Sequence, residues 1–141
     1  MKELILTKTE VPPFAKTIAE ELLQKNILCL TGDLGAGKTF FSSKVIQLLT
    51  GDETLTVTSP TFSIVNIYNS KNQKSIYHFD LYRIKTIEEL ENIGFFEALN
   101  EGICIIEWWN IFESELKNLL QNAIFLDIKY VNKDKRKFIY V

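Results

Sequence analysis

The stretch GDLGAGKT, residues 32–39, decides the fold of this chain. It matches the pattern G-x-x-x-x-G-K-[ST] at every position. Directly before it, the apolar run ILCLT at residues 27–31 is typical of a strand buried on both faces. Directly after it, residues 38–49 repeat apolar side chains at helical spacing, and Gly51 follows as a stop signal. A strand, a glycine-rich loop and a helix in this order predict a cradle for phosphate groups.

The residue types of this loop explain how it would bind phosphate. Glycines let the backbone curl inward, so that its N–H groups and the helix N-terminus face the anion. Lys38 is expected to reach the β- and γ-phosphate oxygens, and the Thr39 hydroxyl is expected to ligate Mg²⁺. The residues predicted to contact the nucleotide here are Gly32, Asp33, Leu34, Gly35, Ala36, Gly37, Lys38 and Thr39.

Two carboxylates follow predicted strands elsewhere in the chain. Asp80 comes after residues 75–79 (SIYHF), and Glu107 comes after residues 103–106 (ICII). Folds with such a loop place acids at the carboxyl ends of strands beside the phosphate cradle. One acid would ligate Mg²⁺ directly or through water, while the other would orient the attacking water or hold the Thr39 hydroxyl. Sequence alone leaves open which acid takes which role, so Lys38, Asp80 and Glu107 together are the predicted catalytic residues.

Strand and helix patterns alternate along the rest of the chain. Predicted strands cover residues 3–7, 62–68, 75–79, 103–106, 123–130 and 136–141, and predicted helices begin at Pro12, Thr86 and Ile111. This order predicts an α/β fold, a P-loop NTPase-like three-layer sandwich with a mixed β-sheet. Because 141 residues is the size of one ordinary domain, we expect a single P-loop domain over residues 1–141.

Composition narrows the possible functions. With 46% hydrophobic and 24% charged residues the chain is typical of soluble globular proteins rather than disordered ones. Its net charge of −2 offers no general field for attracting a polyanion, which disfavours tight, direct binding of nucleic acid. Only two of its sixteen basic residues are arginines, Arg83 and Arg136, which argues against a nucleotide kinase with several guanidinium clamps.

Cysteine use and hydropathy indicate a cytoplasmic protein. Cys29 and Cys104 both lie in apolar runs far apart in the sequence, so a reduced, buried pair is expected. The N-terminal apolar stretch is too short for a signal peptide, and no run reaches the ~20 apolar residues of a membrane span. We therefore expect no membrane association.

Three further features lie near these motifs. The segment Ser59–Phe62 precedes a strand, where many P-loop hydrolases keep a loop with a threonine that senses the γ-phosphate, here Thr61. The consecutive indoles Trp108 and Trp109 follow Glu107, and either could flank a nucleotide, face a partner or be structural. His78 has no nucleophile or second histidine beside it and is expected to be structural.

In this order, GDLGAGKT, SPTF, YHFDLYR and IIEWW resemble the TsaE (YjeE-like) ATPases of bacterial tRNA threonylcarbamoyladenosine synthesis. The resemblance covers nearly the whole chain, and the combination of SPTF with HFDLYR makes it specific. It implies an ATPase subunit that acts with TsaD and TsaB, the pair that installs the threonylcarbamoyl group on tRNA. This chain would then reach tRNA only indirectly, and its hydrolysis of ATP would drive or reset the partner complex.

The resemblance also implies residue roles. Thr39 and Glu107 would hold Mg²⁺, Asp80 would be needed for hydrolysis, and Thr61 would belong to a switch-like loop. Trp108 would lie beside the nucleotide. The segment Thr7–Thr9 and the basic turn with Lys135 and Arg136 would approach the adenine or the ribose. The family commonly has one tryptophan after the glutamate, so Trp109 leaves the division of roles between the two indoles open.

Other functions remain as alternatives. Asn132-Lys133-Asp134-Lys135 nearly matches the guanine-reading N-K-x-D of GTPases, but its aspartate comes one position early. A small P-loop kinase lacks its arginines and a long lid segment. A nucleotide-sensing adaptor, in which ATP only orders a docking surface, differs from an ATPase in hydrolysis alone. No arginine finger is evident apart from Arg83, so we expect slow hydrolysis by the isolated chain, because such a finger supplies about 10³–10⁵-fold.

Overall fold

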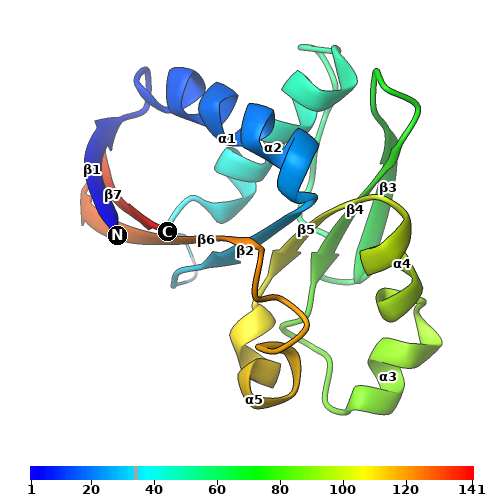
Figure 1. Cartoon of the computed structure of the whole chain (residues 1–141). Helices are drawn as coiled ribbons and strands as arrows, with labels where there is room; N and C mark the ends of the chain where they lie inside the picture. The colour runs from blue at the N-terminus through cyan, green and yellow to red at the C-terminus, as the bar shows by residue number, and fades with distance from the viewer. Residues whose placement is uncertain (34) are drawn as a thin grey trace.

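A computed structural model describes residues 1–33 and 35–141, and within them seven strands form one mixed sheet (Figure 1). The strands lie in the order β1-β7-β6-β2-β5-β4-β3. Their bounds are β1 (Lys2–Thr7), β2 (Ile27–Thr31), β3 (Val65–Asn69), β4 (Ser75–Asp80), β5 (Ile103–Glu107), β6 (Ile124–Asn132) and β7 (Lys135–Tyr140). The helices are α1 (Val11–Lys25), α2 (Lys38–Thr50), α3 (Ile87–Asn92), α4 (Phe95–Glu101) and α5 (Glu113–Leu116), with a 3₁₀ turn η1 (Trp109–Phe112).

The direction of the strands sets the position of the loops that follow them. The central strands β6, β2, β5 and β4 run parallel, while β3 pairs with β4, and β7 with β6 and β1, in antiparallel fashion. The carboxyl ends of the parallel strands therefore meet at one edge of the sheet. Ligands of open α/β sheets bind outside this edge.

Helices cover both faces of the sheet, which gives three layers. In Figure 1, α1 and α2 lie on one face, and α3, α4 and α5 lie on the other. The side chains of β2 alternate accordingly: Leu28 and Leu30 belong to the core beneath α1 and α2, whereas Cys29 belongs to the opposite core. The predicted α/β class, the mixed sheet and the three-layer arrangement are confirmed.

Several helix boundaries follow the predicted signals. Asn26 ends α1 and Gly51 ends α2, both in the left-handed region, with φ of 68° and 77°. The hydroxyl of Thr86 accepts a hydrogen bond from the Glu89 amide at 3.3 Å and so caps α3. Both cysteines are buried and free, and burial raises the pKa of the Cys104 thiol to about 12.

Two predicted elements differ in the structure. Residues 62–64 lie in a turn before β3, because the Ile64 amide donates to the Pro60 carbonyl at 2.6 Å and Ile64 takes a φ of 71°. The helix predicted over residues 111–120 is shorter: η1 and α5 cover Trp109–Leu116, and turns follow. Asn118 and Asn122 lie in these turns, where asparagine is favoured over helix interiors. Among the described helices, none combines the length and apolar character of a membrane span.

Candidate functional site

The motif residues gather in one cavity at the carboxyl edge of the sheet. Gly32 and Asp33 follow β2, and residues 35–37 precede α2, while β4 and β5 end at the same edge of the sheet with Asp80 and Glu107. The cavity has a volume of about 230 Å³. It is lined by Gly35, Gly37, Lys38, Thr39, Phe40, Ser59, Thr61, Asp80, Glu107 and Trp108. The structure therefore brings together residues that the sequence places as far as 73 positions apart, from Gly35 to Trp108.

Lys38, the first residue of α2, points its ammonium group back into the loop. Its Nζ donates hydrogen bonds to the carbonyl oxygens of Gly32 and of Asp33, the latter at 3.0 Å. Burial lowers the pKa of Lys38, while the nearby carboxylates, Glu107 first, act in the opposite direction. Both direct hydrogen-bond acceptors from the loop are neutral carbonyls, and a phosphate anion in the cavity would bind the ammonium more strongly.

Asp80 and Glu107 are direct neighbours on adjacent parallel strands. They are partners in the register of β4 with β5, and both are almost fully buried, with 4% and 2% of their surface exposed. Partners in such a pair lie about 5 Å apart, so negative charge on both carboxylates at once would be mutually repulsive. A cation beside them relieves this repulsion. Lys38 is one such cation, and a divalent metal ion would be a second.

The two oxygens of Asp80 are held by hydrogen bonds from different segments. Oδ1 accepts the Tyr82 amide at 2.9 Å, and Oδ2 accepts the hydroxyls of Ser59 and Thr61, each at 3.2 Å. The two hydroxyls also contact each other at 2.8 Å. Asp80 therefore ties the predicted switch-like loop to the end of β4, which places Thr61 at the cavity as expected.

Glu107 has a different environment. Its Oε2 lies 2.6 Å from Nε2 of His78, and both side chains are buried. Its other oxygen, Oε1, accepts no hydrogen bond within residues 1–33 and 35–141. The sequence interpretation of His78 as a structural residue missed this contact. Alternation along β4 places His78 and Asp80 on the same face, but the contact with Glu107 also requires the register of β4 with β5, which no sequence signal gives.

The two indoles point into different parts of the molecule. Trp108 is half-buried at the cavity, with its ring centroid 4.6 Å from Nζ of Lys38 and 4.7 Å from the ring centroid of Tyr82. Trp109 is 9% exposed and packs against Phe125, at 5.1 Å between centroids, in the core beneath α5. This geometry resolves the open choice: Trp108 belongs to the cavity and Trp109 to the core.

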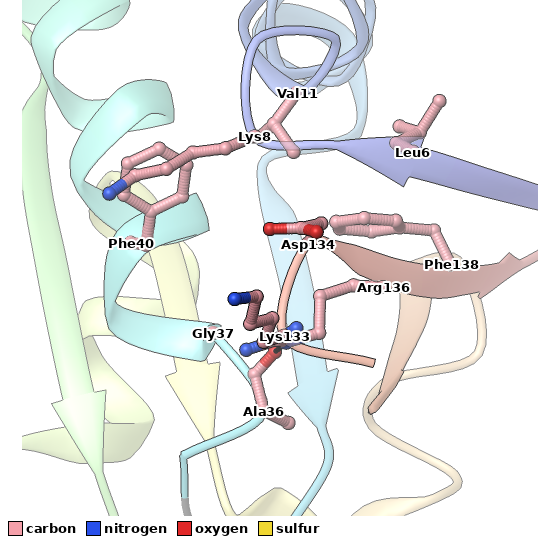
Figure 2. Close-up of a pocket in the computed structure, with 10 residues that line it drawn as sticks. All are labelled: Leu6, Lys8, Val11, Ala36, Gly37, Phe40, Lys133, Asp134, Arg136 and Phe138. Carbon is pink, nitrogen blue, oxygen red and sulfur yellow. Dashed lines mark hydrogen bonds between the residues drawn. The ribbon is translucent and has the colours of Figure 1, made fainter. Parts of the chain in front are cut away.

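A second cavity of about 250 Å³ lies on the other side of the loop (Figure 2). It is lined by Leu6, Lys8, Val11, Ala36, Gly37, Phe40, Lys133, Asp134, Arg136 and Phe138. Figure 2 shows these side chains coming from β1, the start of α1, the start of α2 and the β6–β7 hairpin. Gly37 and Phe40 line both cavities, so the two adjoin at the start of α2.

Arg136 connects this second cavity to the glycine-rich loop. Its Nε donates to the Ala36 carbonyl at 3.1 Å, and its Nη1 donates to the Asn132 carbonyl at 2.6 Å. The same guanidinium lies 4.7 Å from the ring centroid of Tyr130. The arginine thus fixes the hairpin turn against the loop, and sequence reasoning placed it near the nucleotide only through the resemblance.

The remaining predicted contacts occupy more peripheral positions. Lys135 is exposed at the β7 terminus, near Glu10. The Thr7 amide and hydroxyl donate to the Glu10 carboxylate at 2.9 Å each, and these bonds lower the pKa of Glu10. Arg83 lies 4.8 Å from the exposed ring of Phe62. Leu34, a predicted phosphate contact, lies outside the described residues.

The donor set suits magnesium bound together with phosphate. Within residues 1–33 and 35–141, no three histidine, cysteine or acidic side chains gather into a metal cage. Glu107 and Thr39 instead offer a carboxylate and a hydroxyl in the same cavity as Lys38. Mg²⁺ prefers such oxygen donors and commonly uses one or two protein ligands plus phosphate oxygens and water. The residues present therefore fit this ion.

A parallel sheet core covered by helices on both faces, with a glycine-rich loop joining β2 to α2, defines a P-loop NTPase-like fold. The family model "Threonylcarbamoyl adenosine biosynthesis protein TsaE" matches residues 5–138. The chain therefore belongs to the TsaE family, which is involved in the biosynthesis of tRNA threonylcarbamoyladenosine.

Individual relatives agree with this assignment. The TsaE protein of Rickettsia typhi is 41% identical over 131 residues, which cover 92% of this chain and 87% of that protein. The TsaE protein of Aquifex aeolicus is 37% identical over 138 residues, covering 97% and 93%. The crystal structure of YdiB from Bacillus subtilis matches with a TM-score of 0.62 and 28% identity, covering 99% of this chain and 84% of that one.

Proposed function

We propose that this chain binds ATP with Mg²⁺ and hydrolyses it as a subunit of the threonylcarbamoyladenosine synthesis machinery. The observation that carries this proposal is the convergence of Lys38, Asp80 and Glu107 at the end of the glycine-rich loop. One cation and two buried acids, in a cavity with loop glycines, are the groups that binding and hydrolysis of a triphosphate require.

Each residue has a role that follows from its surroundings. The Lys38 ammonium would exchange the Gly32 and Asp33 carbonyls for phosphate oxygens, since charge-assisted bonds to phosphate are stronger. Glu107, with Oε1 available, and the Thr39 hydroxyl would hold Mg²⁺, which neutralises the developing negative charge when bound. Asp80, tied to Thr61, would orient the attacking water and link it to the switch-like loop.

The second cavity would receive the nucleoside. It adjoins Ala36 and Gly37 and combines apolar walls, Leu6, Val11 and Phe138, with the cationic group of Lys133. Apolar surfaces suit a base, and a few polar groups at the rim suit a ribose. Trp108 lies in the first cavity, beside Lys38, and would cover the triphosphate.

The partners follow from family membership and from charge. We propose that TsaB and TsaD are the proteins on which this ATPase acts, and that it drives or resets their complex during transfer to tRNA. A net charge of −2 supports tRNA contact only through that complex. The phosphate cavity contains no arginine among the described residues, so hydrolysis by the isolated chain should be slow.

Calorimetric titration and phosphate release test this proposal. ATP should bind the isolated chain in the presence of Mg²⁺, GTP should bind more weakly, and phosphate release should accelerate when TsaB and TsaD are added. ATP binding without phosphate release, even with both partners present, would contradict hydrolysis and favour a nucleotide-sensing adaptor. Tight binding of tRNA by this chain alone would contradict the indirect route to tRNA.

A further inference from the structure

His78 is the sole histidine of the chain, and the proposed function gives it no role. It lies in the middle of β4, fully buried, on the sheet face that also presents Asp80. The His78 side chain does not line the cavity. It contacts the carboxylate of the candidate metal ligand Glu107 instead. The contact between these two buried polar groups requires an explanation.

Strand register sets the position of the imidazole. His78 is the register partner of Ile105 on β5, so Glu107 lies two positions further along the same face. The Nε2–Oε2 distance is 2.6 Å. In the tautomer with hydrogen on Nε2, the imidazole donates this bond to the carboxylate oxygen. Such a bond to a charged acceptor is short and strong, and it fixes the rotation of the carboxylate.

The other ring nitrogen of His78 indicates that core packing alone does not account for a histidine at this position. Nδ1 of His78 is buried without a hydrogen-bond partner in the described part of the chain. An unpartnered buried nitrogen lowers stability, and an apolar side chain of similar volume would fill the same space without this penalty. The imidazole is therefore explained by what it does for Glu107 and not by packing alone.

We propose that His78 is a positioning residue that holds Oε2 of Glu107 and so directs Oε1 to the metal ion. This inference rests on the proposed binding of Mg²⁺ and ATP. It separates the two acids: Asp80 has both oxygens engaged by Tyr82, Ser59 and Thr61, whereas Glu107 keeps one oxygen for the metal. Partners of this kind commonly change metal affinity by 10–100-fold when they are removed.

Two amide variants form a matched pair for testing this role. In His78→Gln the side-chain amide nitrogen can take the place of Nε2 and still donate to Glu107. In His78→Asn the amide is one carbon shorter and reproduces the position of Nδ1, so it cannot reach the carboxylate. Both substitutions introduce a neutral amide into the same buried space, so a difference between them reports the hydrogen bond.

The first measurement is Mn²⁺ binding, followed by electron paramagnetic resonance, in the presence of a non-hydrolysable ATP analogue. We expect His78→Asn to weaken Mn²⁺ binding about 10–100-fold and His78→Gln to stay within about threefold of wild type. Affinity for the analogue without metal should be unchanged in both. Wild-type Mn²⁺ affinity in His78→Asn, or an equal loss of metal-free nucleotide binding, would overturn the positioning role.

The second measurement needs neither nucleotide nor a variant that folds. With one histidine in the chain, ¹⁵N labelling gives a single pair of ring resonances, which should show hydrogen on Nε2 in the wild type. Hydrogen on Nδ1 alone would overturn the inference. Failure of wild-type protein to bind the Mn²⁺–analogue pair would instead contradict the proposed function, while the tautomer would still show whether His78 donates to Glu107.

Discussion

The two cavities on either side of the glycine-rich loop are built in different ways. The phosphate cavity is formed by the ends of β2, β4 and β5, and its acids are buried and held by defined partners. The second cavity, which we propose for the nucleoside and call the nucleoside cavity, is formed by the β1–α1 connection and the β6–β7 hairpin, and its lysines are exposed. Central parallel strands fix the first cavity, whereas edge strands and turns form the second.

The cost of a substitution should therefore differ between the two cavities. A substitution in the phosphate cavity leaves a buried charge without its partner, which is costly in both binding and catalysis. A substitution at the rim of the nucleoside cavity removes a solvent-exposed group, which typically contributes less than about 1 kcal/mol. The two cavities should therefore respond unequally to mutation.

The largest effect is expected at Lys38. Lys38→Ala removes the ammonium that would bind the β- and γ-phosphates, so phosphate release with TsaB and TsaD present should fall by about 10³-fold. Lys25→Ala, at the exposed end of α1, is the matched control and should retain wild-type turnover. Equal turnover in wild type and Lys38→Ala would show that Lys38 of the glycine-rich loop takes no part in ATP hydrolysis.

Substitutions of Asp80 and of Glu107 should impair different steps, hydrolysis in the first case and Mg²⁺-dependent binding of ATP in the second. Asp80→Asn should lower phosphate release by about 10²-fold while ATP and Mg²⁺ still bind, because Asp80 would act on the water and the loop. Glu107→Gln should weaken Mg²⁺-dependent binding of ATP, because it removes the proposed metal ligand. Calorimetry with and without Mg²⁺ separates the two, and full ATPase rates in both variants would contradict their roles.

The loop glycines test how tightly β2 and β6 enclose the cradle. A Cβ at Gly32 would lie 2.5 Å from the Ile128 carbonyl oxygen, at a φ of +148°, whereas a Cβ at Gly35 meets nothing within 4 Å. Gly32→Ala should thus lower the free energy of unfolding by about 1–3 kcal/mol in urea titration. Gly35→Ala, at a φ of +79°, should lower the free energy of unfolding by less. Equal losses would show that the close approach to β6 has no effect.

The smallest effect is expected at the rim of the nucleoside cavity. Lys133→Ala should lower ATP affinity about threefold and leave the binding of inorganic triphosphate unchanged, because only the nucleoside would reach this residue in the proposed binding mode. Arg136→Ala should weaken the binding of both ligands, since its guanidinium also holds Ala36 of the loop. If Lys133→Ala weakens inorganic triphosphate as much as ATP, the division into two cavities is wrong.

Sequence could predict the phosphate cavity because its determinants are local. The loop motif lies between a strand and a helix, and Asp80 and Glu107 directly follow apolar runs, so a parallel sheet is enough to bring them together. The sheet class and the ends of α1 and α2 followed from residue types in the same way. The strand register that joins His78 to Glu107 depends on pairing between distant segments, which single-chain periodicity leaves open.

The nucleoside cavity and the turns around it could not be predicted in detail. Lys8, Lys133 and Phe138 come together only because β1 and β6 both pair with β7, and no motif marks them. The turn at residues 60–64 replaces the first part of a predicted strand, because one hydrogen bond to the Pro60 carbonyl outweighs the alternating pattern. Tertiary contacts decide such positions, whereas local propensity only biases them.

A crystal structure of the chain with a non-hydrolysable ATP analogue and Mg²⁺ would decide whether the glycine-rich loop binds phosphate. The proposed phosphate site predicts phosphates in the cavity of Lys38, Asp80 and Glu107. It also predicts that the Lys38 ammonium turns from the Gly32 and Asp33 carbonyls to phosphate oxygens, and that the metal ion binds Glu107 Oε1 and the Thr39 hydroxyl. An analogue bound elsewhere, with Lys38 still bonded to its own loop, would contradict it.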